Sequence, residues 1–448
     1  MADNSDKYNS AINYLYGLQK YGIKLGLDNT NALMKMLGRP HESFRSIHIA
    51  GTNGKGSTAT AVSSILIKSG FRVGLFTSPH LVSFTERIKI NDRRISESDV
   101  FEIAALIRGK VSETDLNPTF FEVVTAMAFY YFSINNVEWA VVETGMGGRL
   151  DATNVLHPDA AVITNVSLDH CEFLGNSIYE ITGEKAGIIK PGVPLVTASR
   201  NEEVIEQLSS AAVEHGSQIH IYGRDFRGTI SDMDDRHIVF DYRGQRDYSG
   251  LTAPLPGEYQ LYNMCTAVRV SEILREKGLP ISDLSVKTGL QDISLRGRLE
   301  WASQNPPILI DCAHNQDAAE SLAASVKRLF SNKKIIIIAG IMADKDIRGI
   351  LRQLAPLAET MILTKAKCER AAIPEKLREA MSDICGTCDN PGSYSLTVTG
   401  SVGEALDLAE SLCSKDHIIL VTGSFYTSGE VMEILGAEST LSGLREHK

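Results

Sequence analysis

The chain has 448 residues, of which 43% are hydrophobic and 22% are charged, and its formal net charge is −10. One hydrophobic core cannot serve this length, so two or three domains are expected. The negative charge argues against nucleic acid and acidic membrane surfaces as partners, and an anionic substrate must therefore meet a local basic site. The polar N-terminus lacks the apolar core of a signal peptide, and no apolar run is long enough to span a membrane. With seven scattered cysteines, these features predict a cytoplasmic protein.

Short apolar runs and helical patterns alternate in the first part of the chain. The runs typical of buried strands lie at residues 47–50, 72–77, 139–143, 160–164 and 194–198. Helical patterns lie between them at residues 59–69, 97–110 and 121–134. Strands separated by helices predict a parallel, doubly wound sheet, in which ligand-binding loops lie at the carboxyl ends of the strands.

The turn between the first strand and the first helix has the sequence Gly51-Thr52-Asn53-Gly54-Lys55-Gly56-Ser57-Thr58. Such a turn aims backbone N–H groups and the positive end of a helix dipole at one point. It departs from the usual phosphate-loop pattern because Gly56 separates Lys55 from Ser57. The order of strand, loop, lysine and helix still predicts a nucleoside triphosphate site.

The pattern changes twice further along the chain. Residues 218–252 alternate short polar and apolar stretches, which predicts a small antiparallel patch, and two helical stretches follow at residues 259–277 and 280–291. A second strand–helix alternation begins at residue 307 without a phosphate loop of its own. Its strands are expected at residues 308–310, 334–339, 360–363, 394–398 and 417–422.

We therefore predict an α/β protein with two domains. The first is an N-terminal P-loop doubly wound ATPase domain at residues 1–296, which carries the antiparallel patch near residues 218–252. The second is a smaller, Rossmann-like C-terminal α/β domain at residues 297–448. Within it, Cys385 and Cys388 form a lone pair, which we interpret as two thiols in a surface loop.

Polar residues follow three strands of the predicted first sheet. Ser78, Glu143 and His170 each stand at or just after a strand end. A carboxylate on an apolar strand is costly to bury unless a cation or hydrogen bonds meet it, and next to a triphosphate that cation is usually Mg²⁺. Ser78 and Glu143 are therefore magnesium candidates, with the capping of glycine-rich backbone as the alternative for Glu143. Imidazole prefers other metals, so the spacing alone favours a structural role for His170.

Other polar residues leave two interpretations open. Thr119 and Glu122 have the spacing of a helix capping box, although Phe120 and Phe121 between them could line an aromatic substrate slot. Lys185 stands beside Glu184, where an exposed ion pair is the default expectation.

The second domain also places polar residues at strand ends. These residues are Asp311, His314, Asp344, Lys345 and Ser424. Because this domain has no phosphate loop, we expect this edge to face the first domain. Arg298 would then lie between the domains, where its guanidinium fork suits a phosphate.

Taken together, the motifs resemble the folylpolyglutamate synthase family of Mur-type ATP-dependent amide ligases, many of whose bacterial members are also dihydrofolate synthases. The matching segments are residues 51–58 (GTNGKGST), 77–81 (TSPHL), 143–154 (ETGMGGRLDATN), 169–170 (DH), 184–189 (EKAGII), 311–315 (DCAHN) and 344–346 (DKD). The resemblance runs from about residue 14 to residue 430, in the order and spacing of the family.

The resemblance implies roles for particular positions. It implies that ATP is bound by the loop from Gly54 to Ser57 and by Asn263, Arg298 and Asp311. It implies one Mg²⁺ near Ser78 and Glu143 and a second near His170, with a carbamate formed by CO₂ on Lys185. Lys55, Lys185 and His314 are the expected catalytic residues. The segments that match pterin-binding positions are Gly17, Leu18 and Gln19, then Thr119, Phe120, Phe121 and Glu122, then Leu150, Asp151 and Ala152.

The resemblance implies ligation of L-glutamate to a folate, and to dihydropteroate, through an acyl phosphate made with ATP. Gln19 stands where some bifunctional relatives have histidine, and Phe120 where others have tyrosine, so the alternative is folylpolyglutamate synthase activity alone. Small-molecule substrates and a monomer are expected. Rival interpretations are a peptidoglycan-precursor ligase, a GTP-dependent switch and a simple kinase, although the usual guanine-reading motif Asn-Lys-x-Asp is absent from the sequence.

Overall fold

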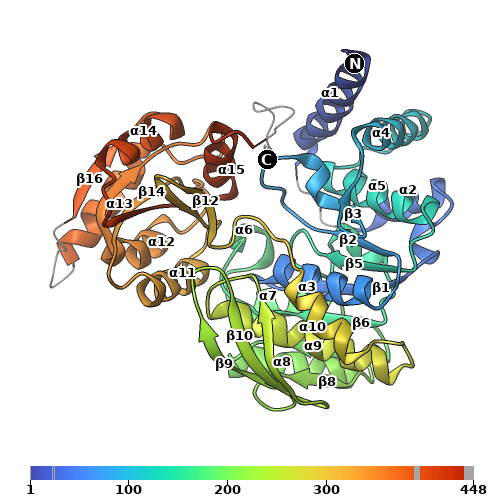
Figure 1. Ribbon diagram of the computed structural model, residues 1–448. Coiled ribbons are helices and arrows are strands. Elements are labelled where there is room, and N and C mark those ends of the chain that lie inside the picture. Colours follow the sequence, from blue (N-terminus) through green and yellow to red (C-terminus); the bar gives the residue numbers. More distant parts are fainter. Residues whose placement is uncertain (1, 23, 25, 388–393, 438–448) are drawn as a thin grey trace.

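The computed structural model describes residues 2–22, 24, 26–387 and 394–437, and within them it forms two α/β units, each with its own main sheet (Figure 1). Cys388 and the residues that follow it to 393 lie outside the described part, so the interpretation of the cysteine pair stays a prediction. Both units consist of a largely parallel sheet between layers of helices, which confirms the predicted fold class.

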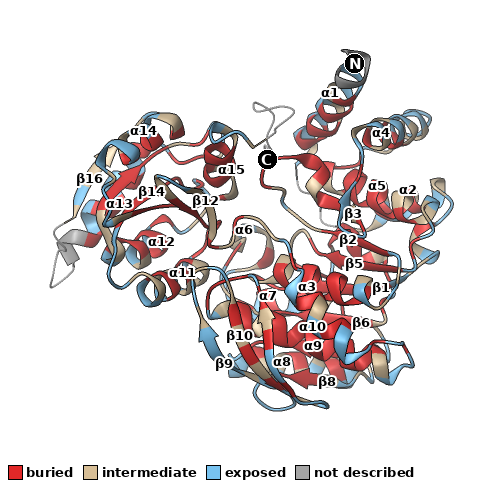
Figure 2. Ribbon diagram, viewed as in Figure 1, coloured by how far each residue is buried: buried red, intermediate tan, exposed pale blue. Residues whose placement is uncertain are grey.

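The first sheet has eight strands in the order β4-β3-β2-β5-β1-β6-β7-β8. The strands are β1 (Arg45–Ala50), β2 (Val73–Phe76), β3 (Ile88–Ile90), β4 (Arg93–Arg94), β5 (Trp139–Glu143), β6 (Ala160–Ile163), β7 (Leu195–Thr197) and β8 (Ile219–Ile221). β2, β5, β1, β6, β7 and β8 pair in parallel, and β3 and β4 complete one edge in antiparallel pairing. The central strands are continuous apolar runs because helices cover both of their faces (Figure 2).

One face of this sheet carries the helix that follows the phosphate loop. The elements on this side are α3 (Lys55–Lys68), α9 (Tyr259–Glu276) and α10 (Asp283–Gln291), with the three-stranded antiparallel sheet of β9 (Arg227–Met233), β10 (Ile238–Arg243) and β11 (Tyr248–Ala253) behind them. One hydrophobic core joins these elements to the main sheet. The antiparallel patch predicted for residues 218–252 thus corresponds to β9–β11, whereas its first residues form β8, which is parallel to β7.

Other helices complete the first unit around two further cores. The helices of the first group are α1 (Ala2–Gly17), α2 (Asp28–Met36), α4 (Glu97–Ser112) and α5 (Phe120–Ile134). Those of the second group are α6 (Cys171–Leu174), α7 (Ile178–Ala186) and α8 (Glu202–Glu214). Short 3-10 turns lie at Leu18–Tyr21, Pro40–Glu42, Phe84–Arg87, Ala152–Val155 and, in the second unit, Ala355–Leu357.

The second sheet has six strands in the order β12-β13-β17-β14-β15-β16. They are β12 (Glu300–Gln304), β13 (Pro307–Ile310), β14 (Lys334–Ala339), β15 (Ala358–Leu363), β16 (Ser395–Val398) and β17 (His417–Thr422). The helices that cover it are α11 (Gln316–Leu329), α12 (Ile347–Leu354), α13 (Pro374–Thr387), α14 (Val402–Leu412) and α15 (Phe425–Ile434). Separate hydrophobic cores lie on its two faces, so this unit is doubly wound as well.

The sequence patterns did not predict β12, which is polar and pairs antiparallel with β13 at the edge of the sheet. Across the part of the chain that the structure describes, no helix combines the length and the apolar character that a membrane crossing requires.

Candidate active site

The phosphate loop lies where β1 ends and α3 begins, and it adopts a conformation that glycine permits. Gly51 and Gly54 have φ angles of 147° and 85°. A Cβ atom on Gly54 would lie 2.2 Å from Asn263 Oδ1, and one on Gly51 would lie 1.9 Å from Thr164 Oγ1. The helix N-terminus has no side-chain cap, so its N–H groups and dipole are available to an anion.

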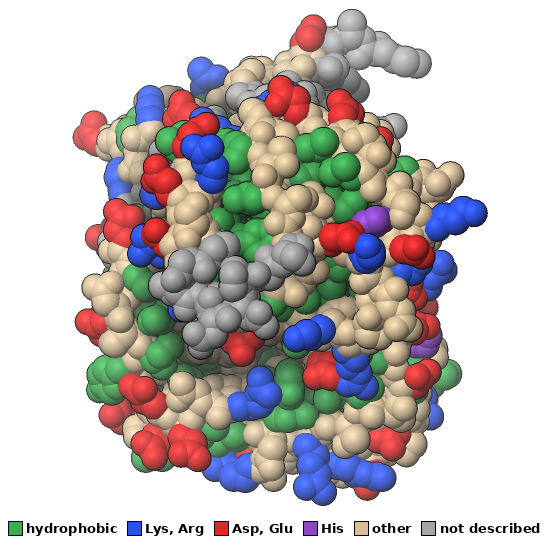
Figure 3. Space-filling model, turned by 90° about the vertical axis from the view of Figure 1, so that its left-hand side faces the viewer, with side chains coloured by type: hydrophobic (Ala, Val, Ile, Leu, Met, Phe, Trp, Pro, Cys, Tyr) green, Lys and Arg blue, Asp and Glu red, His purple; other side chains and the backbone are tan. Residues whose placement is uncertain are grey.

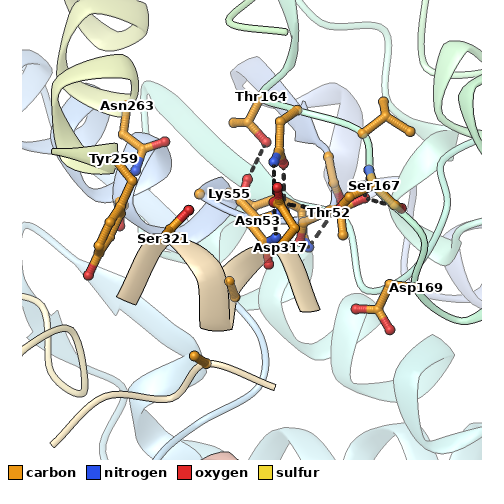
Figure 4. A pocket seen from close by; sticks show the side chains of 18 of the residues that line it. Thr52, Asn53, Lys55, Thr164, Ser167, Asp169, Tyr259, Asn263, Asp317 and Ser321 are labelled. Carbon is orange, nitrogen blue, oxygen red and sulfur yellow. Dashed lines mark hydrogen bonds between the residues drawn. The ribbon is translucent and has the colours of Figure 1, made fainter. Parts of the chain in front are cut away.

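Lys55 folds over its own loop. Its Nζ donates to the carbonyl oxygens of Gly51 and Thr52, at 3.2 and 3.0 Å. Figure 4 shows Lys55 among the residues that line a cavity of about 650 Å³, with Tyr259 and Asn263 on one side and Asp169 on the other. The ammonium group is thus already positioned at the loop that is expected to bind phosphates.

Glu143 is a buried carboxylate beside this loop, and its side chain has few partners. Oε2 accepts the backbone N–H of Ser78 at 3.1 Å, and a Cβ on Gly56 would lie 3.5 Å from the same oxygen. Burial raises the pKa of Glu143, while Lys55 and the Ser78 hydrogen bond oppose that shift. A desolvated carboxylate next to a phosphate loop, with the Ser78 residue against it, provides oxygen donors of the kind that Mg²⁺ prefers, so these residues fit a magnesium ion.

His170 and His314 come from different domains and lie on either side of Asp169. Asp169 Oδ2 is 3.7 Å from His314 Nε2, and Asp169 Oδ1 is 4.0 Å from His170 Nε2. Burial lowers the pKa of His170 to about 3 and that of His314 to about 4, so both imidazoles are neutral at pH 7 and keep a lone pair. His170 also has a left-handed backbone with φ 52°, a conformation that is enriched at functional sites.

No group of three or more His, Cys, Asp or Glu side chains with metal-binding geometry occurs among the described residues. A magnesium ion at this site would therefore depend on one or two protein ligands, on water and on phosphate oxygens, which is the usual pattern for Mg²⁺ at nucleotides.

Lys185 differs from the default expectation, because it forms no exposed ion pair with Glu184. Glu184 pairs with Arg149, whereas the Lys185 residue is only 3% exposed and its Nζ donates to the Gly51 carbonyl at 2.7 Å. Burial, with help from the charge of Lys55, lowers the Lys185 pKa to about 7. The sequence could not reveal this burial, since it comes from the packing of α7 against the phosphate loop.

The far side of the large cavity contains the other expected nucleotide-binding residues. Asn263, Arg298 and Asp311 all line it. Asp311 Oδ2 accepts the Leu299 N–H at 3.1 Å and the Tyr259 hydroxyl at 3.3 Å, and burial raises its pKa. The structure thus brings the phosphate loop and these residues from both domains to one cavity.

A second cavity of about 290 Å³ adjoins the first, and it contains most of the residues predicted to bind the pterin. These are Gln19, Thr119, Phe120, Phe121, Glu122, Leu150, Asp151 and Ala152. Gly17 and Leu18 do not line it: Gly17 ends α1, and Leu18 is buried in the core beneath. The predicted capping box exists too, because Thr119 and Glu122 exchange side chain–backbone hydrogen bonds at the start of α5. The capping box is therefore confirmed, and Phe120 and Phe121 also line the cavity, so their part in a substrate slot stays a prediction.

Two acidic residues, Asp169 and Asp317, make contacts between the domains that were not predicted. Asp169 forms a buried ion pair with Lys345 and accepts Asn315 Nδ2 at 3.1 Å. Asp317, in the first turn of α11, accepts Asn53 Nδ2 at 2.8 Å (Figure 4). In the sequence, Asp317 is only an acidic residue at a helix start, which is a common feature, and its partner is 264 positions away.

Comparisons with known proteins agree with this arrangement. The model of the Mur ligase middle domain matches residues 49–271, and that of the Mur ligase, glutamate ligase domain matches residues 297–425. The chain is 32% identical over 446 residues to a dihydrofolate synthase/folylpolyglutamate synthase of Bacillus subtilis, covering 96% of this chain and 99% of that one.

Solved structures of folylpolyglutamate synthases are similar to this chain as well. A Mycobacterium tuberculosis folylpolyglutamate synthase complexed with ADP superposes with a TM-score of 0.88 at 31% identity, over 96% of this chain and 100% of the other. Escherichia coli FolC in complex with DHPP and ADP superposes with a TM-score of 0.85 at 30% identity, over 96% and 97% of the two chains. On sequence and structure alike, the chain belongs to the folylpolyglutamate synthase/dihydrofolate synthase family of Mur-type, ATP-dependent ligases.

Proposed function

We propose that this protein joins L-glutamate to the carboxylate of a folate or of dihydropteroate in a reaction driven by ATP. The observation that carries the proposal is the connection between the two cavities. The residues that line both are Ser78, Pro79, Gly145, Met146, His170, His314 and Phe425. A nucleotide on the phosphate loop and a pterin-bearing acid among Phe120 and Phe121 would meet at this junction.

The proposed reaction needs ATP because a carboxylate has no good leaving group for an amine to displace. Its oxygen is a poor leaving group, so the acid must first take the γ-phosphoryl group of ATP and become an acyl phosphate. The amine of glutamate then attacks the acyl carbon, and phosphate leaves. Two anions must approach for the first step, and Lys55 at the loop offsets their repulsion.

Ser78 and Glu143 would hold one magnesium ion at the junction, and His170 would hold a second. When bound, the metal supplies neutralisation of phosphate charge. The neutral imidazole of His314 lines both cavities from the second domain, where it would face the reacting carbon. Contacts between the domains, such as Lys345 with Asp169, would help to keep water from this region, where it would hydrolyse the acyl phosphate.

Lys185 would carry a carbamate. Carbamate formation requires a neutral amine, whose nitrogen attacks the carbon of CO₂ and loses a proton. With a pKa of about 7, an appreciable fraction of Lys185 is neutral at physiological pH, unlike that of an ordinary lysine. The product would be an anion beside Lys55 and the phosphate loop, where it could support a metal.

We further propose a monomer in the cytoplasm, with the boundary between the domains at residues 296 and 297. Basic and acidic side chains are interspersed on the face that Figure 3 shows, which supports small molecules rather than nucleic acid or a lipid surface as partners there. Light scattering of the purified chain measures its mass in solution.

The deciding experiment supplies ATP, magnesium and L-glutamate with tetrahydrofolate, with dihydropteroate or with neither acid, and measures ADP and the amide product. We expect acid-dependent ADP release with both acids and one new amide for each phosphate. Turnover with tetrahydrofolate alone would establish the alternative, folylpolyglutamate synthase activity without dihydrofolate synthase activity. Absence of an amide with either acid would refute the proposal.

A further inference from the structure

The incoming amino acid has no binding residue among those discussed so far, although the proposed reaction requires one. In the proposed function the nucleotide occupies the large cavity, and the segments expected to bind the pterin form the first-domain side of the smaller one. The second domain forms the opposite wall of that smaller cavity with Met342, Lys345, Arg370, Ser424, Phe425 and Tyr426. An amino acid that attacks at the junction near His314 would approach along this wall.

Glutamate has two carboxylates, so its site requires a cation. The cations that line the smaller cavity in the described part of the chain are Lys24, Arg87, Lys345 and Arg370. Lys24 donates to the Asn117 carbonyl at 2.8 Å on the first-domain side. Arg87 donates to His80 Nδ1 at 2.8 Å and lies over the Phe120 ring, at 5.4 Å.

Lys345 and Arg370 belong to the second-domain wall, and their surroundings differ. The Lys345 side chain is 7% exposed and is neutralised by Asp169 across the domain boundary. The Arg370 side chain is 21% exposed and lines the cavity. Arg370 is therefore the cation of this wall that an anionic ligand can reach.

The guanidinium of Arg370 is held in place and still has unused hydrogen-bonding capacity. Its Nη2 donates to both carboxylate oxygens of Asp344 at 3.0 Å. Its Nε is buried and has no acceptor within the described residues. A carboxylate matches the planar fork of arginine, so a ligand carboxylate in the cavity suits the remaining N–H groups of this guanidinium.

The backbone fixes this group relative to the reaction site. The Arg370 carbonyl accepts the Ala343 N–H at 2.7 Å, and the Ala372 N–H donates to Ile341 at 2.9 Å. The segment of Arg370 is thus tied to the end of β14, next to Lys345. The N-terminus of α15, at Ser424, contributes to the same wall and adds the positive end of a helix dipole.

We propose that Arg370, oriented by Asp344, binds a carboxylate of the incoming glutamate and so selects an acidic amino acid for ligation. This proposal rests on the proposed function, because it assigns the amino-acid subsite of the same reaction. The bound carboxylate keeps the amino acid on the second-domain wall, with its amine directed to the junction near His314.

The test measures KM for each substrate and kcat in Arg370→Gln and Arg370→Lys. We expect KM for L-glutamate to rise by at least 30-fold in Arg370→Gln and by less in Arg370→Lys, while KM for ATP and for the folate stays within twofold. Arg348→Gln is the matched control, since Arg348 pairs with Asp383 on the exposed surface of the same domain. Unchanged thermal unfolding establishes that the variants are folded.

Two analogues identify the carboxylate. L-Glutamine lacks the γ-carboxylate, and L-glutamic acid α-amide lacks the α-carboxylate. The wild-type preference for L-glutamate over one of these analogues should fall at least tenfold in Arg370→Gln. The carboxylate that this analogue lacks is then the one that Arg370 binds.

Unchanged KM for L-glutamate in a folded Arg370→Gln variant, with active wild type, would refute this subsite and leave the proposed function intact. Equal rises in KM for all three substrates would refute it as well, since they indicate a general structural role. Wild type that forms no amide would refute the proposed function and the subsite together.

Discussion

Two buried glutamates of the first domain differ in what surrounds them. Glu272, on α9, is 1% exposed, and its carboxylate accepts hydrogen bonds from Arg269, from the Tyr242 hydroxyl and from the backbone N–H of Arg246, at 2.7–2.8 Å. Glu143 is 4% exposed and accepts one backbone N–H, at 3.1 Å. Both are far from water, but only Glu272 has a cation and a full set of donors in direct contact.

The difference separates a structural charge from one that is ready for a ligand. Burying a carboxylate is unfavourable unless hydrogen bonds and an opposite charge compensate for it. Around Glu272 the protein supplies that compensation itself, and the neighbouring Arg269 also contacts His220. Around Glu143 and Lys185 it does not, since burial shifts both pKa values toward the neutral forms. We infer that metal and phosphate supply the missing compensation around Glu143 and Lys185.

The largest effect is expected for Lys55→Ala. Two unit charges at about 4 Å interact by roughly 4 kcal/mol in an effective dielectric of 20, so the loss of this cation should lower glutamate-dependent ADP release about 1,000-fold. The fold should persist, since Lys55 donates only to its own loop. Lys68→Ala is the control, because Lys68 lies at the other end of α3 and pairs with Asp292 at the surface. A Lys55→Ala rate within tenfold of wild type would remove this lysine from the mechanism.

Lys185→Ala should lower activity by about 100-fold, and acetate should restore part of it. The added carboxylate would take the place of the proposed carbamate in the space that the shortened side chain leaves. Steady-state rates with and without acetate measure the rescue, and chloride at equal ionic strength is the control. If the untreated variant turns over at the wild-type rate, no carbamate at Lys185 is needed.

Glu143→Gln should raise the magnesium concentration needed for half-maximal activity by about tenfold, because an amide keeps the shape of the side chain but loses the charge that attracts the metal. A magnesium titration at saturating ATP measures the change. Glu180→Gln is the control, since Glu180 caps α7 on the exposed surface. An unchanged titration in Glu143→Gln would make this carboxylate structural, like Glu272.

Glu272→Ala should act on stability instead. Removal of one partner of a buried charge pair costs about 3–5 kcal/mol, since it leaves the buried Arg269 with only its longer ion pair to Glu276, at 3.4 Å. Urea unfolding measures this loss, and kcat per folded molecule should stay at the wild-type value. A loss of kcat in the folded variant would show that Glu272 and its partners are coupled to the site around Glu143.

Much of the fold follows from patterns that the sequence displays. β5, β6 and β14 are buried on both faces, so each is a largely apolar run, and the polar residues at their ends mark the site. β12 was missed because an edge strand exposes one side and carries polar residues. β8 was assigned to the antiparallel patch because so short a strand does not reveal its pairing direction.

The site was harder to predict where residues distant in the sequence meet. The motifs contain Lys185 and Asp169, but the burial of Lys185 and the pairing of Asp169 with Lys345 depend on how α7 and the second domain pack. Nothing local distinguishes Arg370 from other surface arginines of the second domain. Its role becomes visible only when Asp344 and the cavity are seen beside it.

The last effect concerns the stability cost of leaving Lys185 unpaired, and it depends on pH. The folded pKa of about 7 lies below the unfolded value near 10.5, so the unfolded chain binds more protons between these values. Wild type should therefore gain up to about 1.4 kcal/mol per pH unit, relative to Lys185→Met, as the pH rises from 7 to 10. Below pH 7 both states are protonated and the cost is complete, so Lys185→Met should be the more stable protein there.

Urea unfolding in CO₂-depleted buffer measures this difference, because it keeps the amine free of carbamate. Parallel stability curves for the two proteins would show that burial of Lys185 carries no pH-dependent cost. The contrast between the surroundings of Lys185 and those of Glu272 would then fail.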